Sequence, residues 1–118
     1  MRYSEMRMSG NSDQGVGLSD LGRFSEAALL ILVSLADGEK HGYAMMADIK
    51  HIAGMQIGPG TLYGAIARLE QRGLIEPLPS EDRRRPYRLT DKGRSVLGYE
   101  MERLDRVVGT GRRRLAPS

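Results

Sequence analysis

The sequence predicts a mainly α-helical domain with one small β-hairpin. Apolar residues recur at helical spacing in four separate segments. Two short segments that flank an arginine-rich stretch have the pattern of a hairpin between the third and fourth of these helices. The 118 residues, 40% of them hydrophobic with one Phe and no Trp, suffice for a single modest core.

The N-terminal part divides into an arm and a first helix. Residues 1–22 are rich in Gly, Ser, Asp and Asn without a sustained apolar period, so we expect a flexible arm. The first helix is expected to start near Arg23, with Ser25 as its N-cap, and to end at Asp37-Gly38. Its buried face consists of Phe24, Ala28, Ile31, Leu32 and Leu35.

Two further helices are expected over residues 42–53 and 58–73. Gly54 has the position of a C-terminal stop for the second helix, and Gly73 has that position for the third. Pro59 suits the first turn of the third helix, because it has no amide proton to leave unpaired. The expected buried positions are Met45, Ile49 and Ile52 in one helix and Leu62, Ile66 and Leu69 in the other.

The C-terminal third contains the hairpin and a fourth helix. Residues 74–78 and 86–89 are the expected strands, with residues 79–85 as the turn between them. Thr90 or Asp91 can cap a helix over residues 91–110, after which residues 111–118 are expected to form a basic, flexible tail. One apolar seam follows this helix, made of Leu97, Met101, Leu104 and Val108.

This order of elements is that of a winged helix-turn-helix domain, expected over residues 23–90. Its third helix can enter the DNA major groove, because the face opposite its apolar stripe is small and polar. Thr61 can donate to a phosphate, and Arg68 can reach a base edge or a phosphate. Tyr63 flanks this face, and packing at the helix margin is the alternative interpretation for its ring. The outward residues are Thr61, Gly64, Ala67, Arg68 and Gln71.

The turn of the hairpin carries a second signal for nucleic acid. Arg83, Arg84 and Arg85 lie at its tip, and Arg88 lies on the return strand. Phosphate oxygens or a narrow minor groove would neutralise such a cluster, although a solvated charged surface is the simpler alternative. From Arg72 to Ser118 there are twelve Lys or Arg residues against seven Asp or Glu, which also favours a polyanionic partner.

Several classes of function find no support in the sequence. The absence of Cys excludes disulfides and thiolate metal sites, and His41 and His51 have no clear ligand partners. No nucleophile–base pair or phosphate-binding glycine loop is visible, so we expect neither an enzyme nor a cofactor. The longest apolar run, residues 27–33, is too short to span a bilayer, so we expect no membrane contact and a cytoplasmic location.

Four motifs together resemble one family of regulators. They are His41-Gly42-Tyr43, Gly58-Pro59-Gly60-Thr61-Leu62-Tyr63, Arg68-Leu69 with Arg72-Gly73-Leu74-Ile75, and Tyr87-Arg88-Leu89-Thr90-Asp91-Lys92-Gly93. The combination is similar to PadR family transcriptional regulators over roughly residues 26–104. The resemblance implies a homodimeric repressor of the short form, with Tyr43, Thr61, Tyr63 and Arg68 at the DNA surface. We also expect Gly60 to contact DNA. Some relatives hold a small hydrophobic effector at the dimer centre, where this chain offers only Tyr99.

The C-terminal seam points to a dimer on physical grounds as well. A lone helix would leave Leu97, Met101, Leu104 and Val108 in water, so we expect the seam to pack on the first helix and on a second copy. A two-fold dimer would present two third helices about 34 Å apart to an inverted-repeat operator in double-stranded DNA. The alternative from another class is a winged-helix interaction module whose basic face binds an acidic protein.

Overall fold

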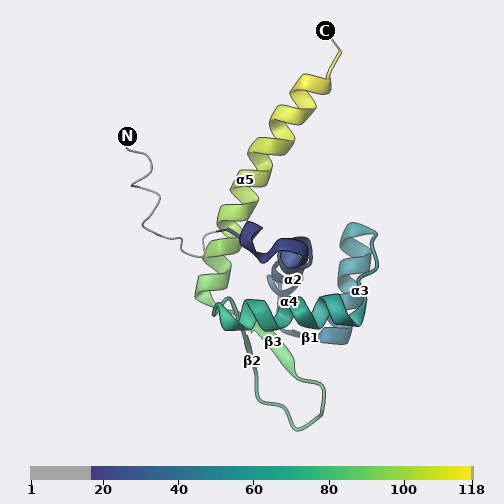
Figure 1. The fold of residues 1–118 in the computed structure, drawn as a ribbon, viewed down its shortest axis with the longest axis vertical. Coiled ribbons are helices and arrows are strands. Elements are labelled where there is room, and N and C mark those ends of the chain that lie inside the picture. Colours follow the sequence, from purple (N-terminus) through teal and green to yellow (C-terminus); the bar gives the residue numbers. More distant parts are fainter. Residues whose placement is uncertain (1–16, 118) are drawn as a thin grey trace.

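The computed structural model describes residues 17–117, and it confirms a mainly helical fold with a small antiparallel sheet. The long α5 rises from one end of the body and the wing, which is the loop between β2 and β3, extends from the other (Figure 1). The elements in chain order are the 3-10 segment η2 (Ser19–Phe24), α2 (Ser25–Leu35), β1 (Lys40–His41), α3 (Gly42–Ala53), α4 (Pro59–Gln71), β2 (Ile75–Pro77), β3 (Pro86–Leu89) and α5 (Asp91–Leu115).

The three helices of the helix-turn-helix surround one apolar core. α2 lies at its centre and contacts α3, α4 and α5. The stripe predicted for α4 is confirmed, since Leu62, Ile66 and Leu69 are buried, and Ala65 is buried beside them. Gly54 and Gly73 have positive φ angles of 68° and 74°, as expected for residues that end helices in the left-handed region.

The sheet has one more strand than the predicted hairpin. β2 and β3 pair antiparallel with Glu76 opposite Arg88, and β1 pairs with the other edge of β3 to give the order β1-β3-β2. Two residues, Lys40 and His41, carry no readable period, so pairing with a distant strand decides their conformation. The extra strand ties the start of α3 to the base of the wing.

The beginning of the chain differs from the expectation. Residues 1–16 of the predicted arm lie outside the described part, but Leu18 and Leu21 are buried in the core. Ser25 is also not the N-cap of α2: Phe24 occupies that position, and the Ser25 hydroxyl donates to the Gly22 carbonyl at 2.9 Å. The predicted burial of Ile52 was wrong as well, because its side chain is 45% exposed near the end of α3.

The C-terminal helix is longer than predicted. Thr90 caps it, because its hydroxyl accepts a hydrogen bond from the Gly93 amide at 3.0 Å. The helix then continues for 25 residues to Leu115, so most of the segment expected to be a flexible tail is helical. Arg112, Arg113 and Arg114 lie in the last turn, where cations interact favourably with the helix dipole. Within residues 17–117, no helix combines the length and apolarity needed to cross a membrane.

Candidate nucleic-acid interface

The wing holds its backbone in place through short-range hydrogen bonds. The Ser80 hydroxyl accepts a hydrogen bond from the Asp82 amide and donates one to the Arg84 carbonyl, both at 3.2 Å. The Asp82 carboxylate accepts a third bond from the Arg84 amide at 3.1 Å. The side chains of Arg83–Arg85 remain exposed. The loop therefore presents three guanidinium groups from an organised backbone.

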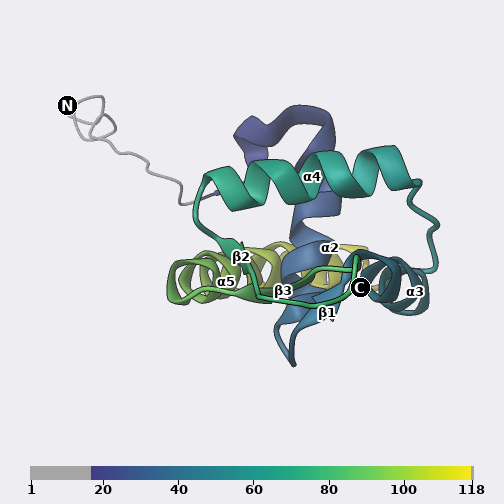
Figure 2. The ribbon, with the colours of Figure 1, turned by 90° about the horizontal axis from the view of Figure 1, so that it is seen from below.

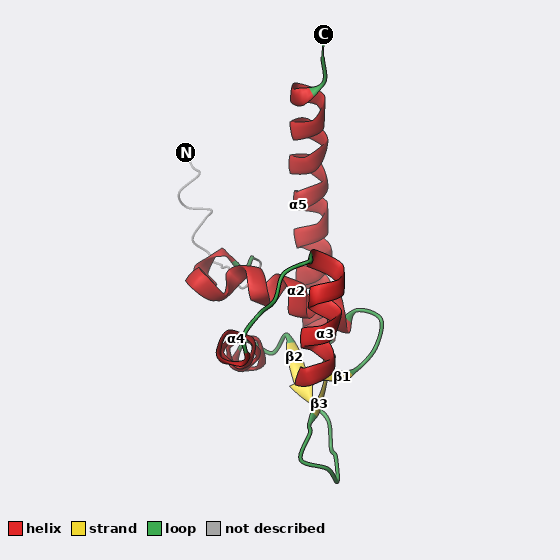
Figure 3. Cartoon of the chain, turned by 90° about the vertical axis from the view of Figure 1, so that its right-hand side faces the viewer, coloured by secondary structure: helices red, strands yellow, loops and turns green. Residues whose placement is uncertain are grey.

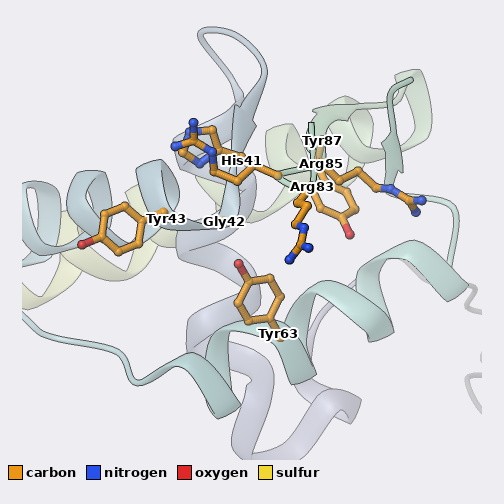
Figure 4. A pocket seen from close by; sticks show the side chains of 8 residues that line it. His41, Gly42, Tyr43, Tyr63, Arg83, Arg85 and Tyr87 are labelled. Carbon is orange, nitrogen blue, oxygen red and sulfur yellow. The ribbon is translucent and has the colours of Figure 1, made fainter. Parts of the chain in front are cut away.

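A pocket of about 380 Å³ lies between this wing, the start of α3 and one flank of α4. Tyr63 points from α4 toward Gly42, whereas Tyr43 projects away from the other side chains (Figure 4). The tyrosines are exposed to 50% and 70%, so both rings are open to a partner. The pocket brings together five of the predicted DNA contacts, which are Tyr43, Tyr63, Arg83, Arg84 and Arg85.

Tyr63 packs at the helix margin, which was the alternative interpretation of its ring. Its hydroxyl lies against the Cα of Gly42, where any Cβ would overlap it. The ring is therefore packed at the margin between α3 and α4 while half of its surface remains accessible. Only glycine at position 42 allows this close approach.

Two other predicted contacts lie on the opposite flank of α4, next to η2. A Cβ at Gly64 would stand 2.6 Å from the Phe24 ring, so Phe24 covers this position. The Arg68 guanidinium lies 4.0 Å from the centre of the same ring and donates to the Gly64 carbonyl at 3.0 Å. Arg68 remains exposed, but the pocket on the wing side of α4 does not include it.

The remaining candidates occupy the first turn of α4 and the sheet. Gly60 is exposed and Thr61 is half-buried at the start of the helix. Arg88 lies across the hairpin from Glu76, and its guanidinium contacts that carboxylate at 2.7 Å. Arg88 is thus already paired, and so is Arg84 of the wing, whose guanidinium lies 3.8 Å from the Asp82 carboxylate, whereas Arg83 and Arg85 form no ion pair within residues 17–117.

The electrostatics of the pocket centre on Tyr87 of β3. Burial raises the pKa of its phenol, the Glu70 carboxylate of α4 raises it further, and the Arg85 guanidinium opposes both. α4 and the wing therefore approach the same side chain from two directions. Tyr87 keeps its proton at neutral pH and can donate a hydrogen bond.

The four residues predicted to form the dimer seam do not all face solvent. Leu97 is buried in the core of its own protomer, and Leu104 is half-buried. Met101 and Val108 are 38% and 48% exposed on α5. The available seam therefore begins at Met101.

Tyr99, the aromatic side chain considered for an effector, is 47% exposed on α5. It lines a second pocket of about 440 Å³ between α5 and the start of α2. The Glu100 carboxylate in this pocket is 5% exposed and accepts a hydrogen bond from Arg103 at 2.9 Å. This pocket is separate from the one beneath the wing.

Sequence reasoning did not count His41 and Tyr87 among the contacts, although both line the wing pocket. His41 is the N-cap of α3, because its Nδ1 accepts the Ala44 amide hydrogen at 3.3 Å. The motifs of the resemblance contain both residues, but only the packing of β3 against β1 brings them together.

The arginine-rich wing lies beside α4, the last helix of the helix-turn-helix, so the fold is that of a winged helix-turn-helix protein. The arginines give this side of the molecule a basic face suited to the DNA backbone. Residues 31–99 match the transcriptional regulator PadR-like family. The chain belongs to this family.

Individual relatives agree with that assignment. The chain is 38% identical over 93 residues to the transcriptional regulator Rv3488 of Mycobacterium tuberculosis, covering 72% of this chain and 83% of that one. It is 46% identical over 87 residues to an uncharacterized 37.1 kDa protein in transposon TN4556 of Streptomyces fradiae. That match covers 74% of this chain but only 25% of the longer protein. A transcriptional regulator from Clostridium thermocellum has a similar structure, with a TM-score of 0.69 and 29% identity over 83% of this chain and 97% of that chain.

Proposed function

We propose that this PadR-family regulator is a cytoplasmic, homodimeric repressor that binds an inverted-repeat operator through α4 and the wing. The observation that carries the proposal is the joint placement of Tyr43, Tyr63 and Arg83–Arg85 around one pocket beside α4. Guanidinium and phenol groups are suitable donors to phosphate oxygens, and α4 supplies the element that enters the major groove.

The homodimer rests on α5. Met101 and Val108 are exposed on α5, whose far end extends beyond the body (Figure 1), and a second copy would remove this apolar surface from water. Two copies related by a two-fold axis would place their α4 helices at successive turns of the duplex, roughly 34 Å apart. Bound in this way near a promoter, the dimer would compete with transcription initiation.

A footprint on the DNA upstream of the protein's own gene tests the proposal. We expect two protected half-sites about 10 base pairs apart, centre to centre. We also expect the affinity to fall as salt rises, with a logarithmic slope of about −0.9 for each phosphate contacted. Protection of a single half-site would contradict the dimer, and a salt-independent affinity would contradict the phosphate contacts. A reporter that rises when the gene is deleted would support repression.

The alternative is an interaction module whose basic face binds an acidic protein. The same arginines of the wing could pair with carboxylates instead of phosphates. An electrophoretic mobility assay separates the two functions, because a protein adaptor should shift no DNA fragment at physiological salt.

A further inference from the structure

A second basic cluster lies on the flank of α4 that faces away from the wing. The guanidinium carbons of Arg23 and Arg68 lie 4.6 Å and 4.0 Å from the centre of the Phe24 ring. Each cation is within the range in which an aromatic face attracts it. Phe24 itself is 8% exposed, so its buried ring is a fixed support for two exposed arginines.

Phe24 and η2 contact α4 at two points. Phe24 packs on Gly64, where no side chain separates them, and Asp20 of η2 forms an ion pair of 3.0 Å with Arg72 at the end of α4. Within residues 17–117, neither Arg23 nor Arg68 forms an ion pair with a carboxylate. Two like charges held beside one ring repel each other, and a shared anion would relieve this repulsion.

The cluster of Arg23 and Arg68 lies on the side of α4 opposite to the wing. Viewed nearly end-on, α4 lies between η2, which follows the grey trace, and the wing (Figure 3). Seen from below, along the direction of the wing, α4 again has η2 on one side and the sheet on the other (Figure 2). Arg68 thus lies on the flank of α4 that faces Arg23 of η2, and the other flank faces Arg83–Arg85.

The dimensions of DNA give these two flanks different partners. The major groove is about 12 Å wide, and an α-helix with its side chains is about 10–12 Å across. A helix lying in the groove therefore has the phosphate backbone of one strand along each flank. Basic groups on the two flanks of α4 would meet phosphates of opposite strands.

We propose that Arg23 is a DNA-backbone contact, and that Arg23 and Arg68, supported by Phe24, hold phosphates of the strand opposite to the strand held by the wing. This inference rests on the proposed DNA-binding function and extends it to η2. Arg23 and Arg68 on one side and Arg83–Arg85 on the other would then form a clamp that holds both DNA strands. The residues of α4 that read the DNA sequence would lie between these two groups.

The test uses the full chain and a duplex that the wild-type protein selects from a random-sequence pool. For each bound protomer, Arg23→Gln should weaken binding about tenfold, as expected for the loss of a charge-assisted contact, and should reduce the salt slope by about 0.9. Arg23→Lys should retain the slope because it keeps the charge. Arg106→Gln, which removes an exposed arginine from α5, is the matched control and should change neither quantity.

Replacing single phosphates by neutral methylphosphonates then assigns the strands. A substitution at the phosphate bound by Arg23 should weaken wild-type binding but not Arg23→Gln binding further. Within each half-site, the phosphates identified in this way should lie on one strand for Arg23→Gln and on the other for Arg84→Gln. Mapping to the same strand, or an unchanged slope in Arg23→Gln, would overturn the clamp while leaving DNA binding intact. If the wild-type protein selects no duplex, the proposed function itself fails.

Discussion

The hydroxyl of Tyr63 in α4 lies in the space that a Cβ on Gly42 of α3 would occupy. The first turn of α3 and the flank of α4 are therefore in direct contact beneath the wing. Gly42 is buried, and the contact sets the spacing of the two helices that form the pocket. Changes at either residue should thus affect both folding and DNA binding.

We expect Gly42→Ala to destabilise the protein, although alanine favours helices intrinsically. The added methyl group overlaps the Tyr63 ring and should lower the free energy of unfolding by about 1–3 kcal/mol, the usual effect of overpacking. Urea unfolding measures this loss. In a Tyr63→Ala background the same substitution should cost much less, because the overlapping atoms are absent. An equal loss in both backgrounds would show that the contact is not the cause.

We expect Arg84→Glu to weaken binding to all DNA sequences by at least tenfold, because it replaces a phosphate contact by a repulsive charge. Fluorescence anisotropy with specific and random duplexes measures the effect. Arg106→Glu makes the same charge change on α5 and should have a much smaller effect. Size-exclusion chromatography should show the same oligomeric state for both variants. Loss of specific binding alone would argue for base reading by Arg84.

We expect Val108→Asp to convert the protein to a folded monomer. Val108 is 48% exposed on the outer part of α5, so a carboxylate there is harmless in the monomer but costly in a buried interface. Light scattering gives the mass, and circular dichroism checks the fold. Arg106 lies roughly 160° around the helix from Val108, so Arg106→Asp should leave the mass unchanged. A Val108→Asp protein that remains dimeric would place the interface elsewhere.

We expect the contribution of Asp20 to stability to vanish in acid. The hydrogen bond from Arg72 lowers the pKa of this carboxyl below its ordinary value of 3.8. The folded state then binds the proton less tightly than the unfolded state, so the stabilisation is present above about pH 4 and is lost as the pH falls through the lowered pKa. Because Asp20 is 70% exposed, we expect only a few tenths of a kcal/mol.

Urea unfolding of Asp20→Asn at two pH values checks this. The variant should be slightly less stable than wild type at pH 7, and this difference in the free energy of unfolding should shrink as the pH falls below about 4. Asp105→Asn is a suitable control, since Asp105 forms no ion pair with the residues described here. A difference that persists unchanged at low pH would mean that Asp20 acts through packing rather than charge.

The helical periods of the sequence were sufficient to predict α3, α4 and the start of α5, because each has a clear apolar face and a recognisable end. The same reasoning missed η2, since Leu18 and Leu21 stand among polar residues and are buried only through contacts with distant helices. It also missed β1, whose two residues are strand only because β3 lies beside them. Short elements defined by tertiary contacts have no local pattern to read.

The sequence predicted which residues are exposed candidates for the site better than it predicted where they lie relative to one another. A helical wheel correctly turned Leu62 and Ile66 inward, but it could not tell which outward residues share a surface. In the structure Tyr63 faces the wing pocket, while Arg68 lies over Phe24 on the other flank. That division depends on where η2 and the hairpin pack, which no period within α4 encodes.

The length of α5 has a mechanical consequence. At 1.5 Å per residue, its 25 residues extend for about 38 Å; α5 contacts α2 and β3, and its far end extends beyond the body (Figure 1). A tilt of about five degrees at its base would displace the far end by roughly 3 Å, close to the rise of one base pair. A small change in the orientation of α5 within the body would therefore be amplified along the helix and would move its far end most.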